Sequence, residues 1–370
     1  MILAIIVFIL IFSFLVLGHE LGHFLAARKI GVRVEEFGIG FPPRIWGKKI
    51  GETLYSVNWI PFGGFVRILG EDRGEEGNKE SLSSRGPGQK AFVLLSGVAF
   101  NFLIAIIVFG LLVSVHGFKT YQAQIFDYEF PFGTQVVYPA INYVVEGSPA
   151  EEAGIEPYDM ILAVNGERID NAIEFTDLTK ANEGNEILFS ILNAQTQEKK
   201  ELNILLRTDS EEGALGVGVS EISELSYNSL ASKIFAGPLH TANITHLTFS
   251  ALGHLIHSSV EQGSIAPLSD NLTGPVGILA MTQLTLAGGP WQVFYLLAAI
   301  SLALAIMNIL PIPAVDGGRM VFVLYEVIFR RKFPERIEHW INVIGFYTLL
   351  LLFFLITIKD IGQLKDILMK

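Results

Sequence analysis

The sequence predicts a polytopic α-helical membrane protein with four transmembrane helices, a membrane-associated β-hairpin region and one inserted α+β domain. Of its 370 residues, 51% are hydrophobic, and the mean hydropathy is +0.46. This composition is too apolar for an ordinary soluble enzyme. Four apolar runs approach the ~20 residues that a helix needs to cross a bilayer. An acidic stretch of mixed polarity separates the second run from the third.

Two properties of the composition exclude whole classes of site or partner. The chain contains no cysteine, which excludes disulfides and cysteine-ligated zinc. The formal net charge is −11, which argues against a nucleic-acid partner.

The first apolar run, within residues 1–30, is uncharged from Met1 to Gly18 and then reads HELGH at 19–23. On a helix, His19 and His23 share a face. Both can therefore ligate one zinc ion, and Glu20 can act as general base on the water that the ion activates. The alternative is a chance HExxH string, but ionisable groups inside a membrane are costly and usually functional. A cleaved signal peptide is disfavoured because the run lacks a basic start.

Residues 31–90 are expected to form a cytoplasmic, membrane-associated β-region followed by a polar linker. Apolar and polar stretches alternate over 32–68, punctuated by glycine and proline, as in β-hairpins. A strand edge here could pair with an unwound substrate segment. A surface hairpin without a role in substrate binding is an equally good interpretation. Residues 71–90 are polar and glycine-rich, which is typical of a linker.

The second run, 91–116, leads into the inserted domain at 117–209. Asn165-Gly166 lies between apolar stretches there and predicts a type I′ hairpin turn. The region at 210–290 is interpreted as a linker with an amphipathic or interfacial helix.

Four histidines in this last region raise the question of a second metal site. We interpret them as surface or interfacial residues, because only Glu261 accompanies them at helical spacing. They are His240, His246, His254 and His257.

The third run, 291–319, ends in NILPIPAVDGGR. Two prolines break the helix, and Asp316 beside the break suits the third protein ligand that a two-histidine zinc site needs. Asp316 follows a crossing in the same direction as His19, so both belong toward the same side of the membrane. The alternative is a solvated helix cap. Asn308 can donate a hydrogen bond to a substrate carbonyl or to the developing oxyanion.

The distribution of basic residues predicts the orientation of the chain. Lysine and arginine concentrate in 31–90 and, between the third and fourth runs, in 320–339. By the positive-inside rule both segments are cytoplasmic. The inserted domain and both termini are then extracytoplasmic, and the fourth run with its tail occupies 340–370.

Together these motifs resemble the site-2 protease family of intramembrane zinc metalloproteases, above all its bacterial RseP-type members. HELGH matches the family's HExxH and NILPIPAVDGGR its NxxPxPxxDGG motif, while SGVAFNF at 96–102 and TGPVGI at 273–278 resemble two further segments. The resemblance implies that His19, His23 and Asp316 ligate one zinc ion and that Glu20 is the catalytic base. It also implies a multi-pass protein of the bacterial inner membrane, with its active site toward the cytoplasm.

A second resemblance lies in the inserted domain. YVVEGSPAEEAGIEPYDMILAVNGERI, residues 143–169, is similar to a PDZ domain, with SPAEEAGI as its short helix. This implies a groove for a peptide ligand, whose carboxylate-binding loop we expect around Tyr138 to Asn142. A passive size filter over the active site is an equally good role. Some family members carry two PDZ domains, and only one is found here.

We therefore predict a metalloendopeptidase that hydrolyses peptide bonds within transmembrane segments of single-pass proteins in the lipid bilayer. The resemblance implies regulated intramembrane proteolysis of substrates such as anti-sigma factors or signal-peptide remnants. A metal transporter or sensor with the same ligands is disfavoured because the other apolar runs hold few ionisable groups. A PDZ scaffold with an inactive site is disfavoured because all four expected zinc-site residues are present.

Overall fold

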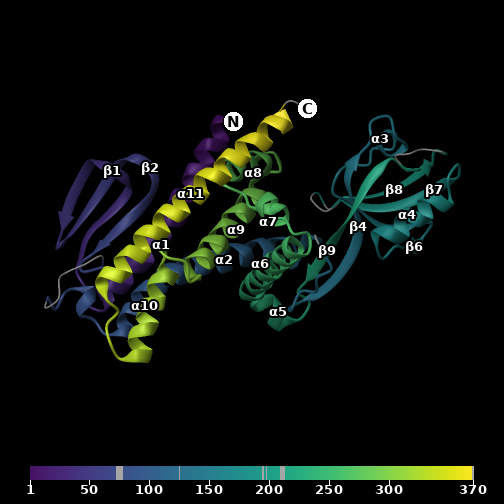
Figure 1. Ribbon diagram of the computed structural model, residues 1–370. Coiled ribbons are helices and arrows are strands. Elements are labelled where there is room, and N and C mark those ends of the chain that lie inside the picture. The colour runs from purple at the N-terminus through teal and green to yellow at the C-terminus, as the bar shows by residue number, and fades with distance from the viewer. Residues whose placement is uncertain (72–77, 125, 194–195, 197, 209–212, 369–370) are drawn as a thin grey trace. The chain divides into compact units, whose positions relative to one another are not determined.

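The computed structural model describes residues 1–71, 78–124, 126–193, 196, 198–208 and 213–368 (Figure 1). The chain divides into two compact units. Unit 1 joins Met1–Leu112 to Thr248–Lys370, and unit 2 is Val113–Leu247. The linker predicted at 71–90 includes 72–77, and the predicted tail includes 369–370; both stretches lie outside the described residues.

Four helices of the described chain are long and apolar enough to cross a membrane. They coincide with the four apolar runs and are α1 (Ile2–Lys29), α2 (Pro87–Val115), α9 (Pro290–Ile309) and α11 (Glu335–Leu368). In unit 1, Ile11 and Leu15 of α1 pack with Leu296 and Ile300 of α9. The outer faces of these helices expose many leucine, isoleucine and phenylalanine side chains, a surface that suits lipid better than water.

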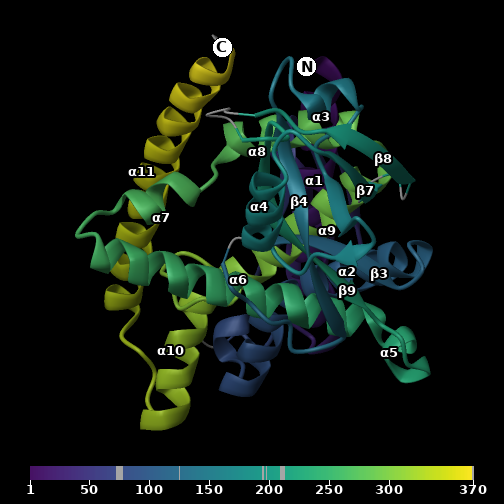
Figure 2. The same ribbon diagram turned by 90° about the vertical axis from the view of Figure 1, so that its right-hand side faces the viewer.

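Shorter helices complete unit 1. They are η1 (Leu82–Ser84), α7 (Ala266–Asn271), α8 (Pro275–Ala287) and α10 (Asp316–Phe329), while α6 (Ala236–Glu261) runs across the boundary between the units. Figure 2 shows α7 reaching α11, drawn in yellow. There Lys359 donates to the carbonyl of Ser269 (2.9 Å), and the buried Asp360 accepts from the N–H of Gly277 (2.8 Å) at the start of α8. Polar side chains of α11 thereby satisfy backbone groups of α7 and α8.

The helix α10 begins inside the predicted third-run segment and continues into the segment predicted as a cytoplasmic loop, 320–339. It is only 14 residues long, and its buried positions include Phe322 and Val323. A short amphipathic helix next to a much stronger apolar run is difficult to recognise from periodicity alone.

The β-region of unit 1 is one long antiparallel hairpin, β1 (Val34–Ile50) and β2 (Thr53–Ile68). Its base is buried, because Val34 and Ile68 pack with Phe24 and Ala27 of α1 and with Val93 of α2. Its outer half is exposed and includes Trp46 and Trp59. Shifts in the pairing register, typical of β-bulges, occur along the hairpin.

Unit 2 contains a seven-stranded sheet in which neighbouring strands are antiparallel. The strand order is β3-β9-β4-β5-β7-β8, with β6 paired to β5. The strands are β3 (Lys119–Gln124), β4 (Thr134–Val144), β5 (Asp159–Val164), β6 (Glu167–Arg168), β7 (Glu186–Asn193), β8 (Lys199–Leu205) and β9 (Val217–Ser226). The helices are α3 (Pro149–Glu152), α4 (Ala172–Ala181) and α5 (Leu230–Ile234).

Local sequence explains several features of unit 2. Ser148 caps α3 and Asn171 caps α4, each accepting a backbone N–H three residues on. Asn165 and Gly166 both have positive φ, 51° and 81°, as the predicted type I′ turn requires. Phe175 of α4 is buried against the sheet with Ile161 and Phe189.

Two features of unit 2 differ from the sequence-based expectations. The strand β9 lies beyond residue 209, the predicted end of the inserted domain, yet it pairs with both β3 and β4. The prediction of a carboxylate-binding loop around Tyr138 to Asn142 is wrong, because these residues lie within the strand β4. Which strands pair depends on contacts between distant segments, which the period of one segment does not reveal.

Candidate metal centre

Three residues predicted as metal ligands lie together in unit 1. Asp316 Oδ2 is 3.0 Å from His19 Nε2 and 3.3 Å from His23 Nε2. The two Nε2 atoms are 3.1 Å apart. The structure therefore brings a residue at the start of α10 to two residues near the end of α1.

The helix α1 positions the two histidines on one face, one turn apart. Both are buried. His23 Nδ1 lies 2.8 Å from the carbonyl oxygen of Val93 in α2. This bond assigns the proton of the neutral ring to Nδ1 and leaves the Nε2 lone pair facing Asp316. His19 Nδ1 has no hydrogen-bond partner among the described residues.

The loop before α10 and the two glycines after Asp316 determine where the aspartate lies. A Cβ on Gly317 would collide with the carbonyl oxygens of Ile309 and Leu310, and one on Gly318 with that of Ile312. Ala314 has a φ of 72°, a left-handed conformation that costs a residue with a side chain on the order of 1 kcal/mol. These features let the chain turn sharply and start α10 close to α1.

Gly97 provides the space in which the histidines meet. A Cβ on Gly97 of α2 would lie 2.5 Å from His23 Nε2 and 2.7 Å from His19 Cε1. A Cβ on Gly22 of α1 would in turn collide with the carbonyl oxygen of Ser96. The two helices therefore cross in near backbone contact. Sequence reasoning did not assign a role to Gly97, although a glycine inside the apolar segment SGVAFNF was an available signal.

Glu20 lies next to His19 on α1 and is held by the hairpin. Its Oε2 accepts a hydrogen bond of 3.0 Å from the backbone N–H of Val66 in β2. The hairpin thus orients one oxygen of the carboxylate.

The remaining predicted residues lie outside this cluster. Asn308 is in the last turn of α9 and is partly buried. The interpretation of the four histidines as surface or interfacial residues is wrong for His240, which is buried and meets the hydroxyl of Tyr227 (3.1 Å). The other three are exposed, and His257 pairs with Glu261 (3.3 Å). Among the described residues, none of the four histidines of this region belongs to a group of three that could hold a metal ion.

The donor set fits a zinc ion. Two imidazole nitrogens and a carboxylate oxygen are hard-to-intermediate donors that zinc accepts at about 2.0–2.1 Å in tetrahedral geometry, which places ligand atoms roughly 3.3 Å apart. The three separations of 3.0, 3.1 and 3.3 Å are close to that spacing. Asp316 Oδ2 is buried without a hydrogen-bond donor among the described residues, which a bound cation would remedy.

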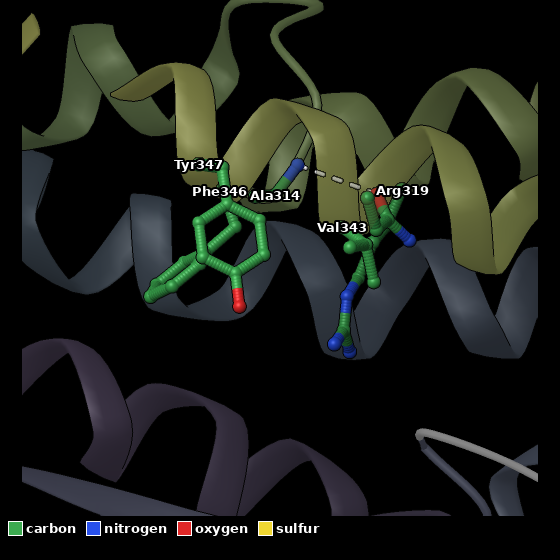
Figure 3. A pocket seen from close by; sticks show the side chains of 6 residues that line it. Ala314, Arg319, Val343, Phe346 and Tyr347 are labelled. Carbon is green, nitrogen blue, oxygen red and sulfur yellow. Dashed lines mark hydrogen bonds between the residues drawn. The ribbon is translucent and has the colours of Figure 1, made fainter. Parts of the chain in front are cut away.

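A hollow of about 340 Å³ lies beside the loop that precedes Asp316 (Figure 3). Asn342 of α11 lines it and accepts a hydrogen bond of 3.3 Å from the N–H of Ala314. Aromatic side chains of α11, Phe346 and Tyr347, form another part of its wall, and Arg319 of α10 extends away from α11.

Two histidines of an HExxH helix that meet an aspartate, in a chain with four apolar helices of membrane-spanning length, define a metal-dependent hydrolase of membranes. Comparison with known proteins agrees. The model of Peptidase family M50 matches residues 7–352, and the chain belongs to this family. It is an intramembrane zinc metalloprotease of the site-2 protease type, and zinc is its cofactor.

Relatives match over nearly their whole length. A Clostridium perfringens protein named as a zinc metalloprotease is 33% identical over 95% of this chain and 97% of its own. A Campylobacter jejuni protein of the same description is 30% identical over 96% and 92%. The regulator of sigma-W protease RasP of Bacillus subtilis is 25% identical over 97% and 98%.

Solved structures similar to this chain include the PDZ domain of the SdrC-like protein of Listeria monocytogenes. It is 17% identical and matches 25% of this chain and 93% of its own, with a TM-score of 0.20. That score is too low to support an argument about the fold.

Proposed function

We propose that His19, His23 and Asp316 hold the catalytic zinc ion and that Glu20 is the general base of peptide hydrolysis. The observation that carries this assignment is the convergence of two imidazole nitrogens and one carboxylate oxygen within 3.3 Å of one another. A cradle that a single Cβ on Gly97 would fill supports it further.

Each residue has a distinct part in the reaction. A zinc ion held by His19, His23 and Asp316 would act as a Lewis acid, which would lower the pKa of a bound water and polarise the substrate carbonyl. Glu20 accepts the proton of the attacking water at its carboxylate and donates it to the leaving amine nitrogen. The Val66 N–H holds Glu20 in place for both transfers. Asn308 donates a hydrogen bond to the substrate carbonyl or to the oxyanion that develops from it.

The substrates of this reaction are transmembrane segments of single-pass proteins. A membrane helix keeps its carbonyls in internal hydrogen bonds, so a segment must unwind before it is cut. One relative is named regulator of sigma-W protease. We extend that kind of role to this chain, with membrane-bound regulators such as anti-sigma factors, or signal-peptide remnants, as substrates.

The arrangement in the membrane is also part of the proposal. The hairpin and the segment around α10 face the cytoplasm of a bacterial cell, and unit 2 lies outside the inner membrane as a PDZ domain. The short capped helix α3 and the turn at Asn165-Gly166 support the PDZ assignment. Unit 2 then binds a peptide ligand or restricts access by size.

The decisive experiment uses the full-length protein purified in nanodiscs with a labelled transmembrane substrate. Glu20→Gln should retain one zinc ion per chain but cleave at least 100-fold more slowly, the low end of a general-base contribution. His23→Ala should lose zinc and activity together. The exposed Glu167→Gln in unit 2 is the matched control. Cleavage that persists after chelation, or in Glu20→Gln, would refute the mechanism.

A further inference from the structure

We propose that two ion pairs hold α10 in register at the metal centre and that Glu71 and Arg319 are positioning residues for Asp316. The proposal rests on the assignment of Asp316 as a zinc ligand. It concerns charged residues that have no assigned part in metal binding or in the reaction steps.

The charged residues of α10 follow one face of the helix. Asp316, Arg319 and Glu326 occupy positions i, i+3 and i+10, a spacing that returns to the same face. The buried Val323 at i+7 lies on this face as well. Each of the three charged side chains contacts a different segment of unit 1: the histidines of α1, the segment after β2, and the first turn of α2.

The first ion pair links α10 to the segment that holds Glu20. Arg319 Nη1 lies 2.5 Å from Glu71 Oε1, and both side chains are about a quarter exposed (28% and 25%). Glu71 follows the end of β2, where its N–H donates to the carbonyl of Ile68. The same strand holds Glu20 through the Val66 N–H. The Arg319–Glu71 ion pair therefore fixes the position of Asp316 relative to Glu20, the proposed general base.

The second ion pair links α10 to the helix that orients His23. Lys90 Nζ lies 2.9 and 3.1 Å from the two carboxylate oxygens of Glu326, with each side chain 16% exposed. Lys90 is in the first turn of α2, and Val93, one turn later, meets His23 Nδ1. The Lys90–Glu326 ion pair therefore fixes the position of Asp316 relative to the helix that orients His23.

The position of α10 along its own axis matters because Asp316, the proposed zinc ligand, is the first residue of this helix. A slide of one residue along the helix axis is 1.5 Å, more than the tolerance of a metal–ligand bond, which is about 0.2 Å. Partly buried ion pairs contribute little net free energy of unfolding, but their geometry can select one arrangement over others. Two pairs at one and three turns from Asp316 oppose both sliding and rotation of α10.

The test is a charge-reversal cycle on full-length protein in nanodiscs. Cobalt(II) is titrated into the metal-free protein, and its visible absorption reports affinity and coordination; cleavage of a labelled transmembrane substrate is measured in parallel. Glu71→Arg and Arg319→Glu should each weaken cobalt binding on the order of tenfold or more, as loss of a residue that orients a ligand does. The double variant should recover to within about threefold of the wild type, since it restores an ion pair of opposite polarity.

Several controls separate positioning from general stability. The exposed pair Arg168–Asp170 in unit 2, reversed in the same way, should leave cobalt affinity unchanged. A purely structural role would lower the unfolding temperature of the metal-free protein without changing cobalt affinity, and that result would overturn the proposal. Where a reversal prevents folding, Glu71→Gln and Arg319→Gln form the same cycle, and strict additivity of their effects on cobalt affinity would overturn it equally.

Asp316→Asn distinguishes this proposal from the one on which it rests. If Asp316→Asn binds cobalt like the wild type, the ligand assignment fails. If Asp316→Asn loses cobalt binding while the effects of the Glu71 and Arg319 substitutions on cobalt affinity are simply additive, only the positioning role fails.

Discussion

At the scale of single residues, the space for the two histidines depends most directly on the missing side chain of Gly97. Gly97→Ala should weaken zinc binding by roughly 100-fold, the upper range for changes next to a metal site, because its Cβ would lie 2.5 Å from His23 Nε2. Isothermal titration of zinc into the metal-free protein measures the effect. Gly88→Ala on the same helix meets nothing within 4 Å and is the control. Equal zinc affinity in both variants would contradict the crowding.

We expect buried His240 to make the stability of unit 2 depend on pH. Burial lowers the pKa of His240 to about 4 from an ordinary value of 6.5. The folded state thus excludes a proton that the unfolded chain binds below pH 6.5. The contribution of neutral His240 to the free energy of unfolding is therefore fully present above pH 6.5. It decreases by up to about 3 kcal/mol as the pH drops toward 4. Thermal unfolding of the full chain at pH 7.5 and pH 5 should show a larger loss in the wild type than in His240→Leu. Equal losses would exclude His240 as the cause.

At the scale of elements, α11 packs against the loop that precedes Asp316. A Cβ on Gly345 would collide with Pro313, while one on Gly362 of the same helix meets nothing within 4 Å. Gly345→Ala should therefore displace the loop and reduce cleavage by on the order of tenfold, a magnitude that small displacements near a reaction centre can reach. Gly362→Ala should cleave normally. The ratio of the two rates on one substrate checks the expectation, and a ratio near one would show that the loop tolerates the shift.

The β1–β2 hairpin was predicted from sequence periodicity, but its contact with Glu20 was not. Alternating polarity and the turn residues between 32 and 68 predicted β structure, and the structure has β1 and β2 there. That β2 also holds Glu20, through a backbone N–H of Val66, could not be predicted. A backbone donor carries no signature in the identity of its residue.

At the scale of the whole molecule, the absence of cysteine makes orientation testable. Glu52→Cys places a single thiol at the β1–β2 turn, and Glu167→Cys places one in unit 2. By the positive-inside rule, a membrane-impermeant maleimide should label Glu167→Cys in intact cells and Glu52→Cys only after permeabilisation. Labelling of both from the same side would overturn the predicted topology.

Much of this molecule could be predicted from local sequence. The HELGH spacing placed His19 and His23 on one helix face, and uninterrupted apolar runs marked the helices α1, α2, α9 and α11. These features follow from the helix repeat and from the length needed to cross a bilayer. Asp316 was predicted as the third ligand from its place beside a helix break, from the direction of the crossing that precedes it, and from the resemblance of NILPIPAVDGGR to the family motif.

Only the tertiary structure decided how distant segments meet. It brought Asp316 within 3.3 Å of both histidines, opened the space at Gly97, and paired Glu71 with Arg319 across 248 positions of the chain. The physical reason is that local periodicity records which face of a segment is apolar, whereas the partner of that face depends on the packing of all segments at once.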